Sequence, residues 1–144
     1  MDCIEELFLI NVNEHDMQNS TILNRDQVNA ALNAIHTLDV GKRRKKVLNA
    51  FDIVILNLRE NTGEVMLTRD QLAQKIGCAP SIVSRIMINL VHLGIITRKQ
   101  KRMRAVKGLD TIAYFVNPHV AWKGSFIAFK ARIAESKPPF SPSL

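Results

Sequence analysis

Five residues recur at the spacing of one helical face, and most of them offer hydrogen-bonding chemistry. The set is Ser81, Ser84, Arg85, Ile88 and Asn89. A guanidinium can donate two parallel hydrogen bonds to O6 and N7 of guanine, and hydroxyl or amide groups can reach other base edges or phosphates. We therefore expect this face to read bases in the DNA major groove, with Arg85 as the principal reader.

Two basic clusters flank this helical segment. The first is the unbroken run Lys42, Arg43, Arg44, Lys45 and Lys46, and the second, which contains no acidic residue, is Arg98, Lys99, Lys101, Arg102, Arg104 and Lys107. A single basic run is often only a solvated surface. Two runs around one motif favour contacts with the phosphates of a DNA backbone.

The 144-residue chain is basic, with a formal net charge of +7 and a pI near 9.8, which is typical of proteins with a polyanionic partner. The charge is divided unequally along the chain. Residues 1–39 hold seven acidic residues and one arginine, a net charge of −6, whereas the remaining residues hold 19 basic and six acidic ones, a net charge of +13. The positive charge therefore accompanies the predicted recognition helix.

The segment that must position Arg85 has the spacing of a helix-turn-helix. Ala73 lies four residues before Gly77, and Val83 and Ile86 follow at the spacing that closes the angle between two helices. Helices that meet at about 90 to 120° around a tight turn leave no room for a large side chain at Ala73. The turn needs a positive φ, which Gly77 adopts without strain. Two ordinary packed helices can share this spacing, so the motif alone leaves their purpose open.

The predicted ends of both helices carry suitable residues. Thr68 is a good N-cap, because its hydroxyl can accept from the backbone amide of Asp70 or Gln71. The same helix start is expected to lie near a DNA phosphate. Pro80 suits the first turn of the second helix, and Gly94 ends that helix.

Two predicted strands complete a winged helix. Residues 95–97 and 111–116 have strand character, and the second basic cluster forms the loop between them, the wing. Upstream, residues 45–61 predict a helix and residues 64–67 a short strand that can join the wing strands in a three-stranded sheet. We predict a mostly α fold with a small β-sheet: a winged helix-turn-helix core with extra N- and C-terminal helices.

The chain is divided into an acidic N-terminal segment (1–40), a winged-helix DNA-binding domain (41–125) and a C-terminal segment (126–144). Residues 25–38 predict an amphipathic helix that must pack either on the winged helix or against its copy in a second subunit, and residues 126–134 have their own apolar face. Because helix-turn-helix proteins commonly bind paired half-sites as two-fold dimers, we expect a homodimer. Residues 137–144, which hold three of the five prolines, are expected to be disordered.

Catalysis is not expected from this sequence. An enzyme that nicks DNA through a tyrosine and a bound metal would need closely spaced histidines, but the four histidines are scattered and the only tyrosine, Tyr114, falls in a predicted strand. No G-x-x-x-x-G-K-[ST] sequence is present to hold a nucleotide. We therefore expect no enzymatic activity, no metal and no cofactor.

Composition also indicates a compartment. Cys3 and Cys78 lack the spacing of a disulfide framework and suit a reducing cytoplasm. The sequence shows no secretory signal, and its apolar stretches are far shorter than the ~20 residues needed to cross a bilayer. We expect a cytoplasmic protein without a membrane partner.

The residues around the motif resemble a known family. GKRRKKVLNAFDIVILNL, LVHLGIITRK and above all FVNPHVAWKGS (residues 115–125) resemble the RepL family of plasmid replication proteins, in which a winged-helix segment ends in an Asn-Pro-x-x-x-aromatic-basic-Gly signature. The matching residues here are Asn117, Pro118, Trp122, Lys123 and Gly124. The resemblance covers about residues 41–125. It implies a sequence-specific double-stranded-DNA-binding protein in plasmid replication initiation or copy-number control, with host replication proteins as further partners.

Other functions remain open at this point. A winged-helix transcriptional regulator, such as a repressor or autorepressor without a replication role, rests on the same residues. A winged helix that only binds proteins would have no affinity for DNA. The net charge of +13 on residues 40–144 argues against this function. A regulator that responds to a small molecule would need a pocket between the N-terminal helix and the core, and no polar cluster marks one.

Overall fold

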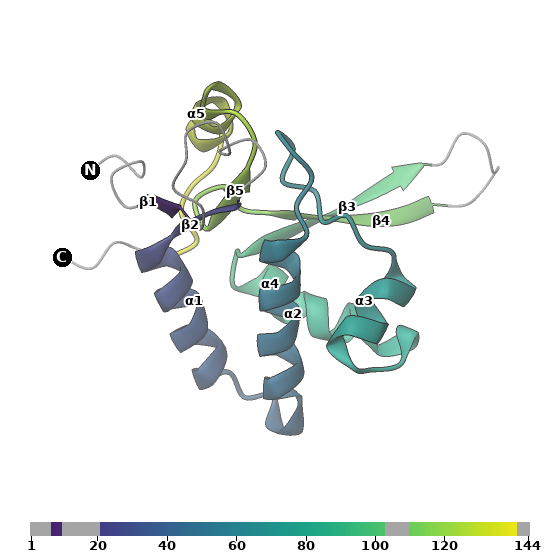
Figure 1. Ribbon diagram of the computed structural model, residues 1–144. Helices are drawn as coiled ribbons and strands as arrows, with labels where there is room; N and C mark the ends of the chain where they lie inside the picture. Colours follow the sequence, from purple (N-terminus) through teal and green to yellow (C-terminus); the bar gives the residue numbers. More distant parts are fainter. Residues whose placement is uncertain (1–6, 10–20, 103–109, 141–144) are drawn as a thin grey trace.

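The computed structural model describes residues 7–9, 21–102 and 110–140, and most of its elements are helical (Figure 1). The helices are α1 (Arg25–Thr37), α2 (Arg44–Leu56), α3 (Arg69–Ile76), α4 (Val83–His92) and α5 (Phe126–Ala134). The strands are β1 (Leu7–Leu9), β2 (Thr21–Asn24), β3 (Ile96–Arg102), β4 (Asp110–Val116) and β5 (Ala121–Lys123). This confirms the predicted fold class, a winged helix-turn-helix core with added N- and C-terminal helices.

The helix-turn-helix forms as its sequence predicts. α3 begins with a capping box, in which Thr68 Oγ1 accepts from the Gln71 amide at 3.2 Å and Gln71 Oε1 accepts from the Thr68 amide at 2.9 Å. α3 ends at Gly77, whose φ is +85° and whose amide donates to the Ala73 carbonyl. Ala73 is buried at the crossing. A short 3₁₀ turn, Pro80–Ile82, then leads into α4 with the proline in its first turn.

The core forms around α2, which packs against α1, α3 and α4. Phe51 and Val54 of α2 are fully buried, as are Ala31 and Ile35 of α1. The amphipathic helix predicted near the N-terminus therefore packs on the winged helix, the first of the two arrangements considered for it. Burial of these apolar side chains is the main force that holds α1 in place.

α2 ends earlier than the sequence predicts. The apolar repeat suggested a helix through residue 61, but the last helical residue is Leu56. The Asn57 side chain donates to the Ile53 carbonyl at 2.7 Å, and Leu58 forms a bridge with Val65. Leu58 is thus buried by a β-contact, although its position also fits the helical repeat.

The predicted strand at residues 64–67 is reduced to isolated β-bridges. The Val65 amide donates to the Tyr114 carbonyl at 2.8 Å, and the Val116 amide donates to the Gly63 carbonyl at 2.9 Å. These bonds tie the segment to β4, but the strand order of this sheet contains only β3 and β4 among the described residues. The predicted three-stranded wing sheet is therefore a two-stranded hairpin with a bridged third segment.

The wing strands are longer than predicted. β3 and β4 pair in antiparallel register from Ile96 opposite Val116 to Arg102 opposite Asp110. Part of the second basic cluster, expected in the loop, therefore lies in strand β3: Arg98, Lys99, Lys101 and Arg102. Arg104 and Lys107 lie outside the described residues.

A second sheet, which was not predicted from the sequence, joins the N-terminal segment to the residues that follow the wing. β2 lies between β1 and β5, with Ile22 opposite the fully buried Trp122. The Asn24 amide extends this contact by donating to the Val120 carbonyl at 3.0 Å. The N-terminal segment is consequently fixed to the chain that follows the wing.

The expectation of a disordered tail is wrong for residues 137–140. Gln27 of α1 exchanges two hydrogen bonds with the backbone of Phe140, at 3.0 and 3.2 Å, and the Phe140 ring is half-buried against the core. Residues 141–144 lie outside the described part of the chain. Backbone pairing with Gln27 supplies the order that the local proline-rich composition did not suggest.

Among the helices described, none is both long and apolar enough to cross a lipid bilayer.

Candidate nucleic-acid interface

The predicted recognition helix, α4, has one buried face and one open face. Its apolar residues Val83, Ile86, Met87 and Leu90 are buried against the core. The predicted base-reading residues occupy the other side: Ser81 and Arg85 are exposed, and Ser84, Ile88 and Asn89 are partly buried. The set is thus brought together on one face, with Ser81 in the preceding 3₁₀ turn and the others in α4.

Arg85 and Asn89 differ in their freedom to reach a base. Arg85 forms no ion pair with any described residue and extends from the open face. Asn89 Nδ2 donates to the carbonyls of Arg85 and Ile86, at 3.0 and 3.3 Å. Asn89 must break these bonds before its amide nitrogen can donate to a base, so Arg85 is the stronger candidate for direct readout.

Strand β3 presents its basic residues on two different faces. Arg98 pairs with Tyr114 and therefore lies on the side of the hairpin that meets the helix-turn-helix. Lys99 lies on the opposite side, with its Nζ 5.1 Å from the centre of the Phe115 ring. Of the two, only Arg98 lies on the side of the hairpin that faces α4.

The first basic run forms a 3₁₀ turn, Gly41–Arg43, and the first turn of α2. Arg44 Nη2 donates to the Leu38 carbonyl at 2.9 Å, so this guanidinium holds the end of α1. Lys42, Arg43 and Lys45 are exposed, and Lys46 is partly buried. Cations at a helix N-terminus oppose the helix dipole, and a bound anion would relieve that repulsion.

The two basic clusters do not adjoin. In Figure 1 the first run lies at the lower end of α2, whereas β3 and β4 extend away from the opposite end of the domain. The N-terminus of α3, which carries Thr68, lies beneath the wing instead. The candidate interface on this side of the domain therefore comprises α3, α4 and β3, and phosphate contacts by Lys42 to Lys46 stay a separate prediction.

The residues of the Asn-Pro signature fix a corner of the fold. Asn117 Nδ2 donates to the carbonyls of Gly94 and Lys137, and Asn117 Oδ1 accepts from the His119 amide at 2.9 Å. Trp122 is fully buried and packs on Phe129, with ring centres 6.0 Å apart. These residues connect the end of α4, the last wing strand and the C-terminal segment.

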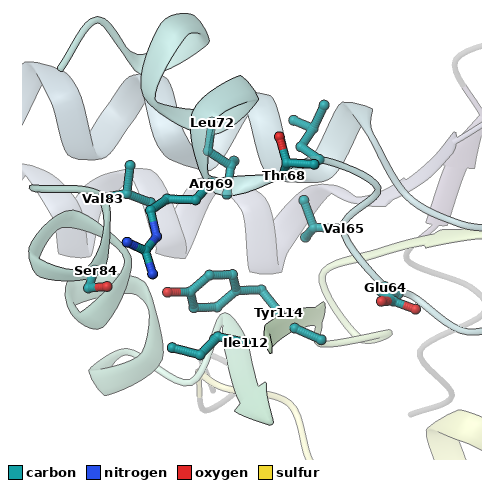
Figure 2. Close-up of a pocket in the computed structure, with 11 residues that line it drawn as sticks. Glu64, Val65, Thr68, Arg69, Leu72, Val83, Ser84, Ile112 and Tyr114 are labelled. Atoms are coloured by element: carbon teal, nitrogen blue, oxygen red, sulfur yellow. The ribbon is translucent and has the colours of Figure 1, made fainter. Parts of the chain in front are cut away.

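One feature of this interface was missed in the sequence. A pocket of about 390 Å³ lies between the start of α3, the start of α4 and β4, and Arg69 and Tyr114 project into it (Figure 2). From the sequence, a regulator that responds to a small molecule would need a pocket between the N-terminal helix and the core, and no polar cluster marked one there. The residues that line the pocket come from distant parts of the chain. The sequence therefore gave only one local sign of the pocket, the basic residue Arg69 directly after the Thr68 cap.

Within the described ranges 7–9, 21–102 and 110–140, no three His, Cys, Asp or Glu residues lie close enough together to hold a metal ion.

Comparison with known proteins found no matching family model, curated protein or solved structure.

Proposed function

We propose that this chain is a sequence-specific double-stranded-DNA-binding protein that acts in the cytoplasm, in plasmid replication initiation or copy-number control. The observation that carries the proposal is the open face of α4 and of the turn before it, which presents Ser81, Ser84 and Arg85 beside the basic strand β3. A helix in the major groove and a cationic hairpin along the backbone are the two parts that sequence-specific binding requires.

Each part has a distinct role in the proposed complex. Arg85 pairs with O6 and N7 of a guanine, while Ser81 and Ser84 contact a neighbouring base edge or phosphate. Arg98, on the helix side of the wing, contacts the adjacent backbone. The N-terminus of α3 at Thr68 adds backbone amides that point toward a phosphate.

The replication role rests on the resemblance of residues 41–125 to the RepL family. Host replication proteins would be the further partners in that role. The alternative function, a winged-helix repressor or autorepressor, uses the same DNA contacts. The two functions differ in the location of the binding sites: iterated sites in a replication origin favour the first, and a single operator at a promoter favours the second.

We also propose that the protein binds DNA as a homodimer through α5. The apolar stripe of α1 is already covered by α2, but Phe126 and Ile127 at the start of α5 remain 39% and 82% exposed. Light scattering should give a dimer mass for the native chain and a monomer mass for Ile127→Glu. A monomer mass for the native chain, with and without DNA, contradicts this proposal.

The experiment that tests the function is selection of bound duplexes from a random DNA pool at physiological salt. An enriched inverted repeat supports both specificity and a two-fold dimer, and direct repeats support an origin. Absence of enrichment contradicts the proposal. Cloning the selected sites with the gene into a plasmid that lacks its own initiator then tests replication, and a promoter fusion tests repression in parallel.

A further inference from the structure

The pocket beneath the wing has the dimensions of a small-molecule site. Its volume of about 390 Å³ lies within the usual range for pockets that bind small organic ligands. It is bounded by the first turns of α3 and α4 and by β4. All three elements are anchored in the core, so the pocket is part of the folded structure.

One end of the pocket is polar. The polar groups that point into it have no hydrogen-bond or ion-pair partner among the described residues. Figure 2 shows the Arg69 guanidinium and the Tyr114 hydroxyl directed toward the same space, with the Ser84 hydroxyl beside them. Tyr114 is 7% exposed as a residue, and its hydroxyl makes no hydrogen bond to another described residue but stays accessible from the pocket. Arg69 forms no ion pair with a described residue either. The guanidinium and the hydroxyl are therefore free to donate hydrogen bonds to a bound acceptor.

The walls of the pocket are apolar. Leu72, Val83 and Ile112 line its interior. The one carboxylate of the lining, Glu64, lies at the opposite end from Arg69 and is 3.8 Å from the Arg59 guanidinium. A ligand with one anionic end and an apolar body therefore matches both parts of the pocket.

We propose that this pocket binds a small amphiphilic organic anion, an aromatic or branched aliphatic carboxylate. The carboxylate accepts hydrogen bonds from Arg69, Tyr114 and Ser84, and the apolar body lies against Leu72 and Val83. A DNA phosphate fits less well, because it offers nothing to the apolar walls of the pocket. Since Ser84 also belongs to the proposed DNA-reading face, the ligand would occupy part of that face.

The test is a titration of the ¹⁵N-labelled full chain, without DNA, followed by ¹H–¹⁵N correlation spectra. The probes are 2-naphthoate, its neutral analogue 2-naphthamide, and inorganic phosphate. Naphthoate should give saturable shifts at the amides of Arg69, Ser84 and Tyr114, with an affinity about tenfold or more above that of naphthamide, because a charged hydrogen-bond pair is lost with the amide. Phosphate should bind more weakly than naphthoate.

Variants identify the contacts. Arg69→Gln should remove the preference for naphthoate over naphthamide, and Tyr114→Phe should weaken naphthoate binding while the spectrum keeps its native dispersion. Lys75→Gln, an exposed substitution at the far end of α3, is the matched control and should change neither affinity.

Three outcomes overturn the proposal: no saturable shifts with naphthoate, shifts confined to another surface, or phosphate binding as tightly as naphthoate. An unchanged naphthoate preference in Arg69→Gln also contradicts it. Because no DNA is present, failure of this test is separate from failure of the proposed DNA binding.

Discussion

Arg98 lies directly opposite Tyr114 in the β3–β4 ladder, so the two side chains share the face of the wing that meets the helix-turn-helix. The neighbouring residue Lys99 has its ammonium group over the Phe115 ring on the other face. Two adjacent cations of the wing therefore have different surroundings, although the sequence presents them as one basic run.

This difference predicts unequal effects of two alanine substitutions on DNA binding. Arg98→Ala should weaken binding to all sequences alike and reduce the slope of log K against log salt by about one, as expected for loss of one phosphate contact. Lys99→Ala should have a smaller effect on both quantities. Fluorescence anisotropy with one selected and one random duplex, over a range of salt concentrations, measures them. Equal losses in the two variants would show that the face of the strand does not matter.

Arg85 should affect specificity as well as affinity. Arg85→Ala should cost about 1–3 kcal/mol at one base pair of the selected site and much less on a site already changed at that pair. The measurement is a comparison of binding to the selected duplex and to every single-base variant. Arg25→Ala, at the exposed first position of α1, serves as the control. An unchanged base preference in Arg85→Ala would remove this residue from the reading set.

Asn117 should contribute to stability through its three hydrogen bonds. Its side chain joins the end of α4 at Gly94, the C-terminal segment at Lys137 and the turn at His119. Asn117→Ala removes all three bonds and should lower the free energy of unfolding by about 2–4 kcal/mol. Urea unfolding, followed by the fluorescence of the single tryptophan, measures this change. Asn33→Ala, on the exposed side of α1, should change it by less than about 0.5 kcal/mol. Similar values for the two variants would contradict the role given to Asn117.

The parts of the fold that were predicted correctly depend on neighbouring residues. The cap at Thr68, the small residue Ala73 and the positive φ of Gly77 each act within a few residues, so their spacing was sufficient to predict the helix-turn-helix. The open face of α4 follows from the same repeat that places Ile86 and Leu90 in the core. The open face of α4 could therefore be predicted from the sequence, and its role in reading bases stays a prediction.

The parts that were missed depend on contacts between distant residues. β2 pairs with β5 about a hundred residues later, and Gln27 binds the backbone of Phe140. Neither contact has a local pattern. Arg44 also belongs to an apparently uniform basic run, yet its bond to Leu38 separates it from the exposed cations beside it. The pocket at Arg69 and Tyr114 was missed for the same reason, since α3 and β4 are far apart in the sequence.

Two glycine substitutions separate backbone strain from steric overlap. Gly124 has φ +138°, and a Cβ built there would overlap the Asn61 side chain and lie 2.6 Å from the Asn61 backbone nitrogen. Asn61 cannot move away easily, because its amide donates to the Lys123 carbonyl and its Oδ1 accepts from the Ser125 amide. At Gly77, with φ +85°, a Cβ meets no atom within 4 Å. Gly77→Ala should therefore lower the free energy of unfolding by about 1–2 kcal/mol through strain alone, and Gly124→Ala by about 3 kcal/mol or more. Urea unfolding of both variants tests this order, and a smaller loss for Gly124→Ala would mean that the corner between Asn61 and Ser125 yields without cost.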